Sequence, residues 1–234
     1  IDNAKSFSDT AMVVISRVGG EGSDLPTDMS TVNYTDNSTE YKDFEDGQHY
    51  LSLSKTERDM VDLVCSNFDN VVLVYNGANT LEMGFVNDYP QIKSVIWCPG
   101  TGQTGFNALG EIVAGEVNPS GHSADTFVYD LTATPSFNNI GDFTYTNADS
   151  LGYTAAGSFG RDPEQVTPHF VNYVEGIYVG YKFYETAAAE GLIDYDKTVQ
   201  YPFGHGLSYT TFTQKIDSMT EADGTITLDV TVTN

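Results

Sequence analysis

The sequence predicts an α/β protein whose mainly parallel sheet is sandwiched between helices, followed by the first strands of an antiparallel β-sandwich. Three short apolar runs occur at residues 11–16, 70–76 and 94–99, and segments with helical spacing of apolar residues lie between and after them. Such alternation is typical of parallel sheets with crossover helices. Residues 224–234 instead alternate apolar and polar side chains with period two, as antiparallel strands do.

The three apolar runs define the expected strands. Residues 70–76, NVVLVYN, are almost continuously apolar, which predicts a strand covered on both faces. Residues 94–99, SVIWCP, predict another strand that ends at a proline. Residues 11–16 also predict a buried strand. In sheets of this class, ligands approach at the carboxyl ends of the strands.

Three segments predict helices. Ser54 and Glu57 form the S-x-x-E pattern of a capping box, and apolar side chains follow at helical spacing at Met60, Val61, Val64, Cys65 and Phe68. The segment TLEMGFVND at residues 80–88 predicts a second helix. FNALGEIVAGE at residues 106–116 predicts a third, whose apolar face is formed by Ala108, Leu109, Ile112 and Val113.

Two long segments lack both periodicities. Residues 17–50 are rich in Asp, Thr, Ser and Asn and follow directly on the first expected strand. Connections of this length are usually functional or mobile, and this one should lie at the carboxyl end of the sheet. Residues 129–170 are rich in Gly, Asn, Thr, Ser and aromatic residues, which predicts a long surface excursion.

The last strand belongs to a different structural class, so we divide the chain into an α/β domain at residues 1–212 and an incomplete β domain at residues 213–234. Residues 198–212, just before this boundary, are dense in turn-forming and aromatic residues. Because a lone strand or hairpin is not stable by itself, we interpret the chain as a fragment.

The composition excludes several classes of function. With 33 acidic and 10 basic side chains, the formal net charge is −23, so a nucleic acid backbone would be repelled. No apolar run approaches the roughly 18 residues that cross a bilayer. Cys65 and Cys98 are too few for a disulfide framework or a CxxC metal site, and we expect both to be reduced core residues. The chain does not open on a leader-like segment, but it begins with Ile rather than Met, so the compartment stays open, with the cytoplasm favoured over export.

No cofactor or metal is predicted. PGTGQTG at residues 99–105 contains G-x-G-x-x-G, but the acidic residue that a dinucleotide site requires after the next strand is missing. A tight turn is therefore favoured over a nicotinamide or flavin site. The acidic segment at residues 36–47 lacks EF-hand spacing, which favours a solvated loop over a calcium site. The four histidines lack zinc spacing, and no G-x-S-x-G elbow marks a serine nucleophile.

One carboxylate follows the first strand in a distinctive setting. In ISRVGGEGSD, Glu21 lies among Gly19, Gly20 and Gly22, which permit backbone conformations that other residues avoid. A carboxyl group held at such a turn is suited to general acid catalysis. On these residues alone, a solvent-exposed turn carboxylate is the alternative.

Six stretches in fixed order resemble the carboxyl-terminal sandwich domain of family 3 glycoside hydrolases, the β-glucosidase family. They are ISRVGGEGSD, YLSLSKTE, NVVLVYNGAN, PGTGQTGFNALGEIVAGEVNPSGH, YVEGIYVGYKFY and YPFGHGLSYTTF. The last strand resembles the start of the fibronectin type III-like domain that follows in many members. Two positions depart from the family pattern: Thr104-Gly105 replaces a glycine pair, and Lys182 replaces an arginine.

The resemblance implies an active site shared by two domains. In this family a (β/α)8 barrel supplies an aspartate nucleophile and most contacts to the terminal sugar, while the sandwich domain supplies the acid/base carboxylate. The family motif E-G-x-D falls on residues 21–24, which implies Glu21 as the acid/base. Asp24 is assigned to substrate binding and, together with Arg17, to holding the loop. Glu45 is the fallback acid, since some relatives carry the acid before a leucine-containing segment like the one at Leu51.

The implied reaction is hydrolysis of terminal non-reducing β-D-glucosyl residues from β-glucosides or short β-linked oligosaccharides, without a cofactor; β-xylosidase or another β-glycosidase activity is the nearest variant. A retaining mechanism needs two carboxyl groups about 5–5.5 Å apart. This chain would supply one and the missing barrel the other, so the isolated chain should be inactive. The alternative from a different class is a carbohydrate-binding or scaffolding module.

Overall fold

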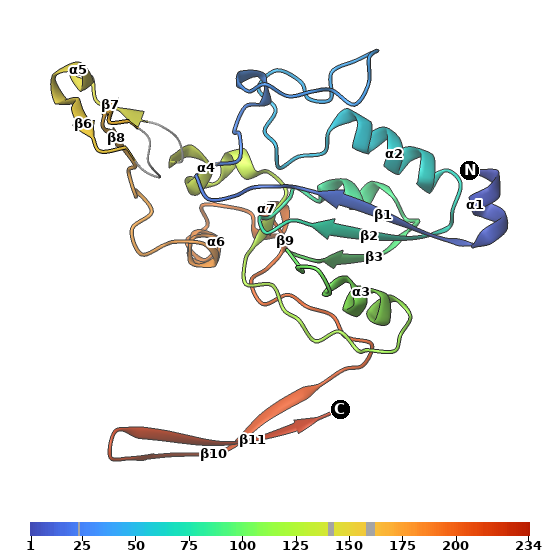
Figure 1. Cartoon of the computed structure of the whole chain (residues 1–234). Helices are drawn as coiled ribbons and strands as arrows, with labels where there is room; N and C mark the ends of the chain where they lie inside the picture. The colour runs from blue at the N-terminus through green and yellow to red at the C-terminus, as the bar shows by residue number, and fades with distance from the viewer. Residues whose placement is uncertain (23, 140–142, 158–161) are drawn as a thin grey trace. The chain divides into compact units, whose positions relative to one another are not determined.

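The computed structural model describes residues 1–22, 24–139, 143–157 and 162–234 (Figure 1). The chain divides into two compact units. The first combines residues 1–99 and 125–202, and the second combines residues 100–124 and 203–234.

A three-stranded parallel sheet forms the centre of the first unit. β1 (Thr10–Ser16), β2 (Asn70–Asn76) and β3 (Ile92–Trp97) lie side by side in that order. β1 and β2 pair without a register shift from one end to the other, and β3 runs parallel to β2. The predicted parallel sheet is therefore confirmed. β2 is covered as expected, with exposed fractions of 1% or less at Val71, Leu73, Val74 and Tyr75.

β1 is buried on one face only. Val13 and Ile15 are almost fully buried, whereas Met12 and Val14 are 46% and 49% exposed. Alternate side chains of a strand point to opposite faces of the sheet, and β1 is an edge strand of this sheet. The prediction of a buried strand is thus right for one face of β1 and wrong for the other.

α2 (Lys55–Cys65) begins where the capping pattern predicts. The Ser54 hydroxyl accepts a hydrogen bond from the Glu57 backbone N–H, and the Glu57 carboxylate accepts one from the Ser54 N–H. Val61 and Cys65 face the hydrophobic core of the first unit. Each large apolar side chain fully buried in such a core contributes about 1.5–3 kcal/mol, so packing on the sheet holds the helix in place.

The crossover from β2 to β3 is not the predicted α-helix. Within residues 80–88 the structure has only the 3-10 helix η2 (Gly84–Asp88). Leu81, Met83 and Phe85 are all buried, so the apolar side chains point inward at every second residue. The non-helical residues before η2 allow this for Leu81 and Met83, whereas a continuous α-helix over residues 80–88 does not. The helix prediction for these residues is wrong.

Short elements complete the first unit. β4 (Phe127–Val128) pairs antiparallel with β9 (Val199–Tyr201). A second small core of Val128, Tyr184 and Val199 lies where β4 and β9 meet α6. The remaining short helices here are α1 (Asp2–Phe7), η1 (Met29–Thr31), η3 (Leu131–Ala133), α4 (Pro135–Asn139), α6 (Tyr181–Ala189) and α7 (Tyr195–Thr198).

The predicted surface excursion at residues 129–170 consists of short, largely exposed elements, although its residues 140–142 and 158–161 lie outside the described chain. Besides η3 and α4, its described residues contain two antiparallel pairs and one further helical turn. They are β5 (Phe143–Thr144) with β8 (His169–Phe170), β6 (Tyr153–Ala155) with β7 (Glu164–Val166), and α5 (Ala148–Leu151).

The second unit contains one helix and one hairpin, namely α3 (Phe106–Val113), β10 (Thr213–Ala222) and β11 (Thr225–Thr233). Asp223 and Gly224 join the two strands with φ angles of 51° and 73°, as in the two-residue turns that suit a hairpin. The predicted helix and terminal strand are confirmed, and every residue of the hairpin strands is exposed. The proposed domain boundary after residue 212 stays a prediction.

Both cysteines are free thiols, as expected, but only Cys65 is buried in the core, whereas Cys98 is half-buried. Burial raises the pKa of each. Across the described ranges, no helix combines the length and the apolar character needed to cross a membrane.

Candidate functional site

The loop at residues 17–50 leaves the sheet at the carboxyl end of β1. Glu21 and Gly22 form a turn, and the φ of 74° at Gly22 explains why glycine follows the glutamate. Glu21 and Asp24 are both exposed, and Ser23 of the E-G-x-D motif lies outside the described residues. Within the described chain, the Glu21 carboxylate has no hydrogen bond or ion pair.

Arg17, at the start of this loop, is buried and uses all five of its guanidinium N–H groups. Nε donates to the Tyr50 carbonyl oxygen at 2.5 Å. Nη1 donates to the Ser16 carbonyl at 2.8 Å and to Glu57 Oε1 at 2.6 Å. Nη2 donates to the Ser52 carbonyl and to Glu57 Oε2, both at 2.6 Å. One side chain therefore joins the end of β1, the end of the loop and the start of α2.

Asp43 corrects the expectation of a fully solvated acidic segment. Asp43 is only 1% exposed. Its carboxylate accepts hydrogen bonds from the backbone and the side chain of Asn37, both at 2.7 Å. It also accepts hydrogen bonds from the Tyr34 and Thr56 hydroxyl groups. Burial raises the pKa of Asp43, but these hydrogen bonds outweigh it and hold that pKa below its usual value. The donors replace water around the charge.

A second set of contacts joins the two arms of the loop. Asp28 Oδ1 accepts from the Ser30 N–H at 2.9 Å and from the Gly47 N–H at 3.1 Å. Hydrogen bonds from Ser30 lower the pKa of Asp28. The Met29 N–H donates to the Gln48 carbonyl oxygen at 2.8 Å. The loop is thus shaped by polar contacts rather than by regular secondary structure.

His49 connects the loop to the segment after β2. It is 5% exposed, and the Leu51 N–H donates to its Nδ1 at 3.2 Å. The proton of the neutral ring therefore lies on Nε2, which donates to Glu82 Oε1 at 3.0 Å. The Leu131 N–H donates to the same oxygen at 2.7 Å. In the described residues, no three His, Cys, Asp or Glu side chains are grouped to hold a metal ion.

Glu45, the fallback acid, is exposed at a different turn of the same loop. Its backbone N–H donates to the Gln48 side-chain oxygen at 2.9 Å, and its carbonyl accepts from the Gln48 N–H at 3.0 Å. These contacts use the backbone of Glu45 and leave its carboxylate in solvent. Glu21 and Glu45 are therefore both accessible, at separate turns.

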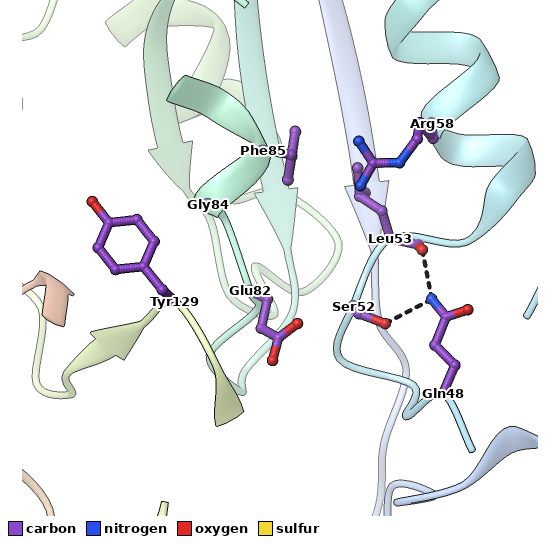
Figure 2. Close-up of a pocket in the computed structure, with 8 residues that line it drawn as sticks. All are labelled: Gln48, Ser52, Leu53, Arg58, Glu82, Gly84, Phe85 and Tyr129. Carbon is purple, nitrogen blue, oxygen red and sulfur yellow. Dashed lines mark hydrogen bonds between the residues drawn. The ribbon is translucent and has the colours of Figure 1, made fainter. Parts of the chain in front are cut away.

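A cavity of about 160 Å³ lies in the first unit (Figure 2). Figure 2 shows Gln48 on one wall, where its side-chain nitrogen donates to the Ser52 hydroxyl and the Leu53 carbonyl at 2.8 Å each. The other lining residues are Arg58, Glu82, Gly84, Phe85 and Tyr129. None of the sequence-predicted site residues lines this cavity.

The G-x-G-x-x-G segment has the geometry of a tight turn, as the sequence analysis favoured. Gly102 has a φ of 65°. A Cβ atom on Gly105, which is the N-cap of α3, would collide with the Thr101 carbonyl oxygen. Glycine is required at both positions by the backbone itself.

The sequence alone does not identify Glu57 and Asp43 as residues that hold the loop. The S-x-x-E pattern marks Glu57 as a helix cap only, and its second partner, Arg17, lies 40 positions away. Asp43 lies in a segment with several other acidic residues, and nothing in the sequence distinguishes it from them. Neither role leaves a local signal in the sequence.

Comparison with a sequence model of the "Glycosyl hydrolase family 3 C-terminal domain" gives a match over residues 2–181. Beta-glucosidase A of Butyrivibrio fibrisolvens is 33% identical over 215 residues, which are 90% of this chain and 22% of that protein. Thermostable beta-glucosidase B of Acetivibrio thermocellus is 31% identical over 163 residues, which are 70% of this chain and 17% of that protein. The chain thus spans about a fifth of the length of these curated relatives.

Solved structures give the same result. A β-glucosidase from Paenibacillus barengoltzii superposes with a TM-score of 0.65 and 27% identity, covering 98% of this chain and 20% of that one. Beta-glucosidase 3B from Thermotoga neapolitana, solved in complex with glycerol, superposes with a TM-score of 0.66 and 25% identity, covering 98% of this chain and 26% of that one.

Proposed function

The chain belongs to glycosyl hydrolase family 3 as its C-terminal domain, and from this membership we propose that it supplies the acid/base carboxylate of a β-glucosidase. The substrates are β-glucosides or short β-linked oligosaccharides, cleaved at the terminal non-reducing glucosyl residue. The nucleophile belongs to a (β/α)8 barrel domain outside this chain. The β-glucosidase names of the relatives support the substrate class.

Glu21 is the proposed acid/base. The observation that carries this assignment is an exposed carboxylate at a glycine turn, on a loop whose root is fixed by buried Arg17. In a retaining mechanism, this carboxyl group gives its proton to the glycosidic oxygen as the bond to the sugar breaks and the nucleophile attacks. As a carboxylate, it then takes a proton from the water that releases the sugar from the enzyme. Asp24 is proposed to bind substrate at the same turn.

The assignment is tested with Glu21→Gln in the intact enzyme, with Glu45→Gln as the matched variant on the same loop. Glu21→Gln should reduce cleavage of a sugar-sugar bond by about 10²–10⁴-fold, as expected for general acid catalysis. The loss should be smaller for a nitrophenyl glucoside, because its leaving group needs little protonation. Azide should restore turnover, since it replaces the water that Glu21 would activate.

Glu45→Gln should leave these rates nearly unchanged. If Glu45→Gln instead shows the leaving-group dependence and the azide rescue, while Glu21→Gln behaves like the parent, Glu45 is the acid and the assignment fails.

The chain alone is proposed to have no hydrolytic activity, because one carboxylate cannot carry out both steps of a covalent mechanism. Incubation of the purified chain with a nitrophenyl β-glucoside should release no nitrophenol, whereas protein that includes the barrel should. Turnover by the chain alone would contradict the division of the site between two domains.

A further inference from the structure

The turn that carries Glu21 has few side-chain contacts, although the Gly20 backbone takes part in a β-bridge. Val18 is 79% exposed, and a Cβ atom placed on Gly20 would meet nothing within 4 Å. A Cβ atom on Gly19 would lie 3.0 Å from the Leu25 side chain, so Leu25 packs close to the backbone at Gly19. Apart from that bridge, the orientation of the turn depends on how its root is held at Arg17, four residues before Glu21.

The root is held by an ion pair with both oxygens of one carboxylate engaged. Arg17 bonds Glu57 through two parallel N–H···O contacts of 2.6 Å, and the Arg17 side chain is 3% exposed. The guanidinium also lies 5.0 Å from the centre of the Tyr50 ring. Glu57 is itself fixed, because its Oε2 accepts the Ser54 N–H in the capping box of α2.

Such a pair is poorly explained by stability alone. Replacing a buried ion pair with apolar residues of similar volume is often neutral or stabilising. The pair instead fixes the orientation of the chain at Arg17. The planar guanidinium presents five donors in a fixed arrangement, and here each donor has an acceptor. A lysine, with three donors on a flexible stem, could not reproduce these contacts.

We propose that Arg17 and Glu57 are positioning residues for the acid/base step, which hold the root of the loop so that Glu21 points at the glycosidic oxygen. Neither residue touches substrate. The inference rests on the proposed role of Glu21 and adds two residues to it. A misplacement of about 1 Å at a reacting group can cost about 100-fold in rate, so a small change at the root should affect proton delivery.

The test compares Arg17→Lys and Glu57→Gln in the intact enzyme with the parent, on glucosides whose leaving groups range from dinitrophenol to an alkyl alcohol. We expect kcat to fall about 10–100-fold with the alkyl glucoside and about threefold or less with the dinitrophenyl glucoside. Azide should partly restore the rate. Glu57→Gln keeps the size of the side chain and one acceptor oxygen, so it separates positioning from misfolding.

The matched control is the exposed pair Lys55–Asp59 on the same helix, where the charged atoms lie 3.0 Å apart. Lys55→Gln and Asp59→Asn should leave the dependence on leaving group unchanged. Melting temperatures of all variants are measured, and the assays are run well below the lowest.

Two results would overturn the inference. In the first, Arg17→Lys and Glu57→Gln lower kcat by the same factor with every leaving group, as expected if the ion pair is only structural. In the second, neither variant lowers kcat at all. If the loss of kcat in Glu21→Gln does not depend on the leaving group, the proposed role of Glu21 fails instead. The same set of glucosides therefore distinguishes failure of the proposed function from failure of the inference about Arg17 and Glu57.

Discussion

The loop at residues 17–50 and the hairpin β10–β11 are opposite cases. In its described residues the loop contains one 3-10 helix, η1, yet it buries a charged arginine at its root and Asp43 and His49 within it. The hairpin is regular along nearly its whole length, yet all of its strand residues are exposed. In this chain, regular secondary structure therefore does not go together with burial of side chains.

The difference lies in where each region finds its hydrogen-bond partners. The hairpin satisfies its backbone by local strand pairing across a two-residue turn. The loop combines local contacts, such as Asp43 with Asn37, with contacts that are distant in sequence, such as Arg17 with Glu57 and His49 with Glu82. We expect the loop to respond strongly to single substitutions and the hairpin weakly, and the following predictions test that contrast.

The largest effect is expected for Arg17→Met. The substitution leaves the partly buried Glu57 without its cation, and breaking such a pair by removing one partner costs about 3–5 kcal/mol. Urea unfolding of the chain, followed by circular dichroism, measures the loss. Lys55→Met is the control, since the exposed Lys55–Asp59 pair is worth about 1 kcal/mol or less. If the two variants lose the same free energy of unfolding, the Arg17–Glu57 pair stabilises the chain no more than the exposed Lys55–Asp59 pair does.

The same contrast explains what the sequence could predict. β2, α2 and β11 are predictable because each has a local signal: an almost continuously apolar run, a capping box with helical spacing, and alternation with period two. The crossover at Leu81, Met83 and Phe85 was misassigned because its inward period of two is set by the surrounding core. Its local sequence allows a helix as readily as an extended chain.

The candidate site divides in the same way. The glycine turn at Glu21 could be found from sequence, because glycines next to a carboxylate are a local pattern. The burial of Asp43 could not, because its hydrogen-bond partners Tyr34, Asn37 and Thr56 are brought together only by the fold. Glu57 could be recognised as a cap from its spacing to Ser54, but its pairing with Arg17 requires the fold itself.

A smaller loss is expected for Asp43→Asn. The new amide group would face the Asn37 donors, and a buried polar group left unsatisfied costs about 1–3 kcal/mol. Because the folded-state pKa of Asp43 lies below its usual value, its contribution is present above the unfolded pKa of about 3.9. It is lost as the pH falls through the folded value.

Parent and Asp43→Asn should therefore differ in unfolding free energy at pH 7 and converge in strong acid. Urea unfolding at a series of pH values measures this. A difference that stays constant down to the lowest pH at which the chain folds would show that the charge of Asp43 does not matter.

The capping box gives a smaller effect again. Ser54→Ala removes the hydroxyl that accepts the Glu57 N–H, and losing an N-cap of this kind costs about 1 kcal/mol. Ser54→Thr keeps the acceptor and should cost less. Urea midpoints for the two variants decide the point. If both variants lose the same stability, the hydroxyl does not cap α2 in solution, and the capping box would consist only of the bond from the Ser54 N–H to the Glu57 carboxylate.

The smallest effect is expected for removal of the hairpin. Truncation after residue 212 deletes two strands whose residues are all exposed, including the apolar row Ile226, Leu228, Val230 and Val232 on one face of β11. Removing surface residues that take no part in a core usually changes stability by about 0.5 kcal/mol or less. The urea midpoint of the truncated chain should therefore match that of the parent, while far-ultraviolet circular dichroism loses part of its strand signal. A fall in the midpoint as large as that of Arg17→Met would show that the exposed hairpin supports the folded core as much as the loop does, and the contrast between the two regions would not hold.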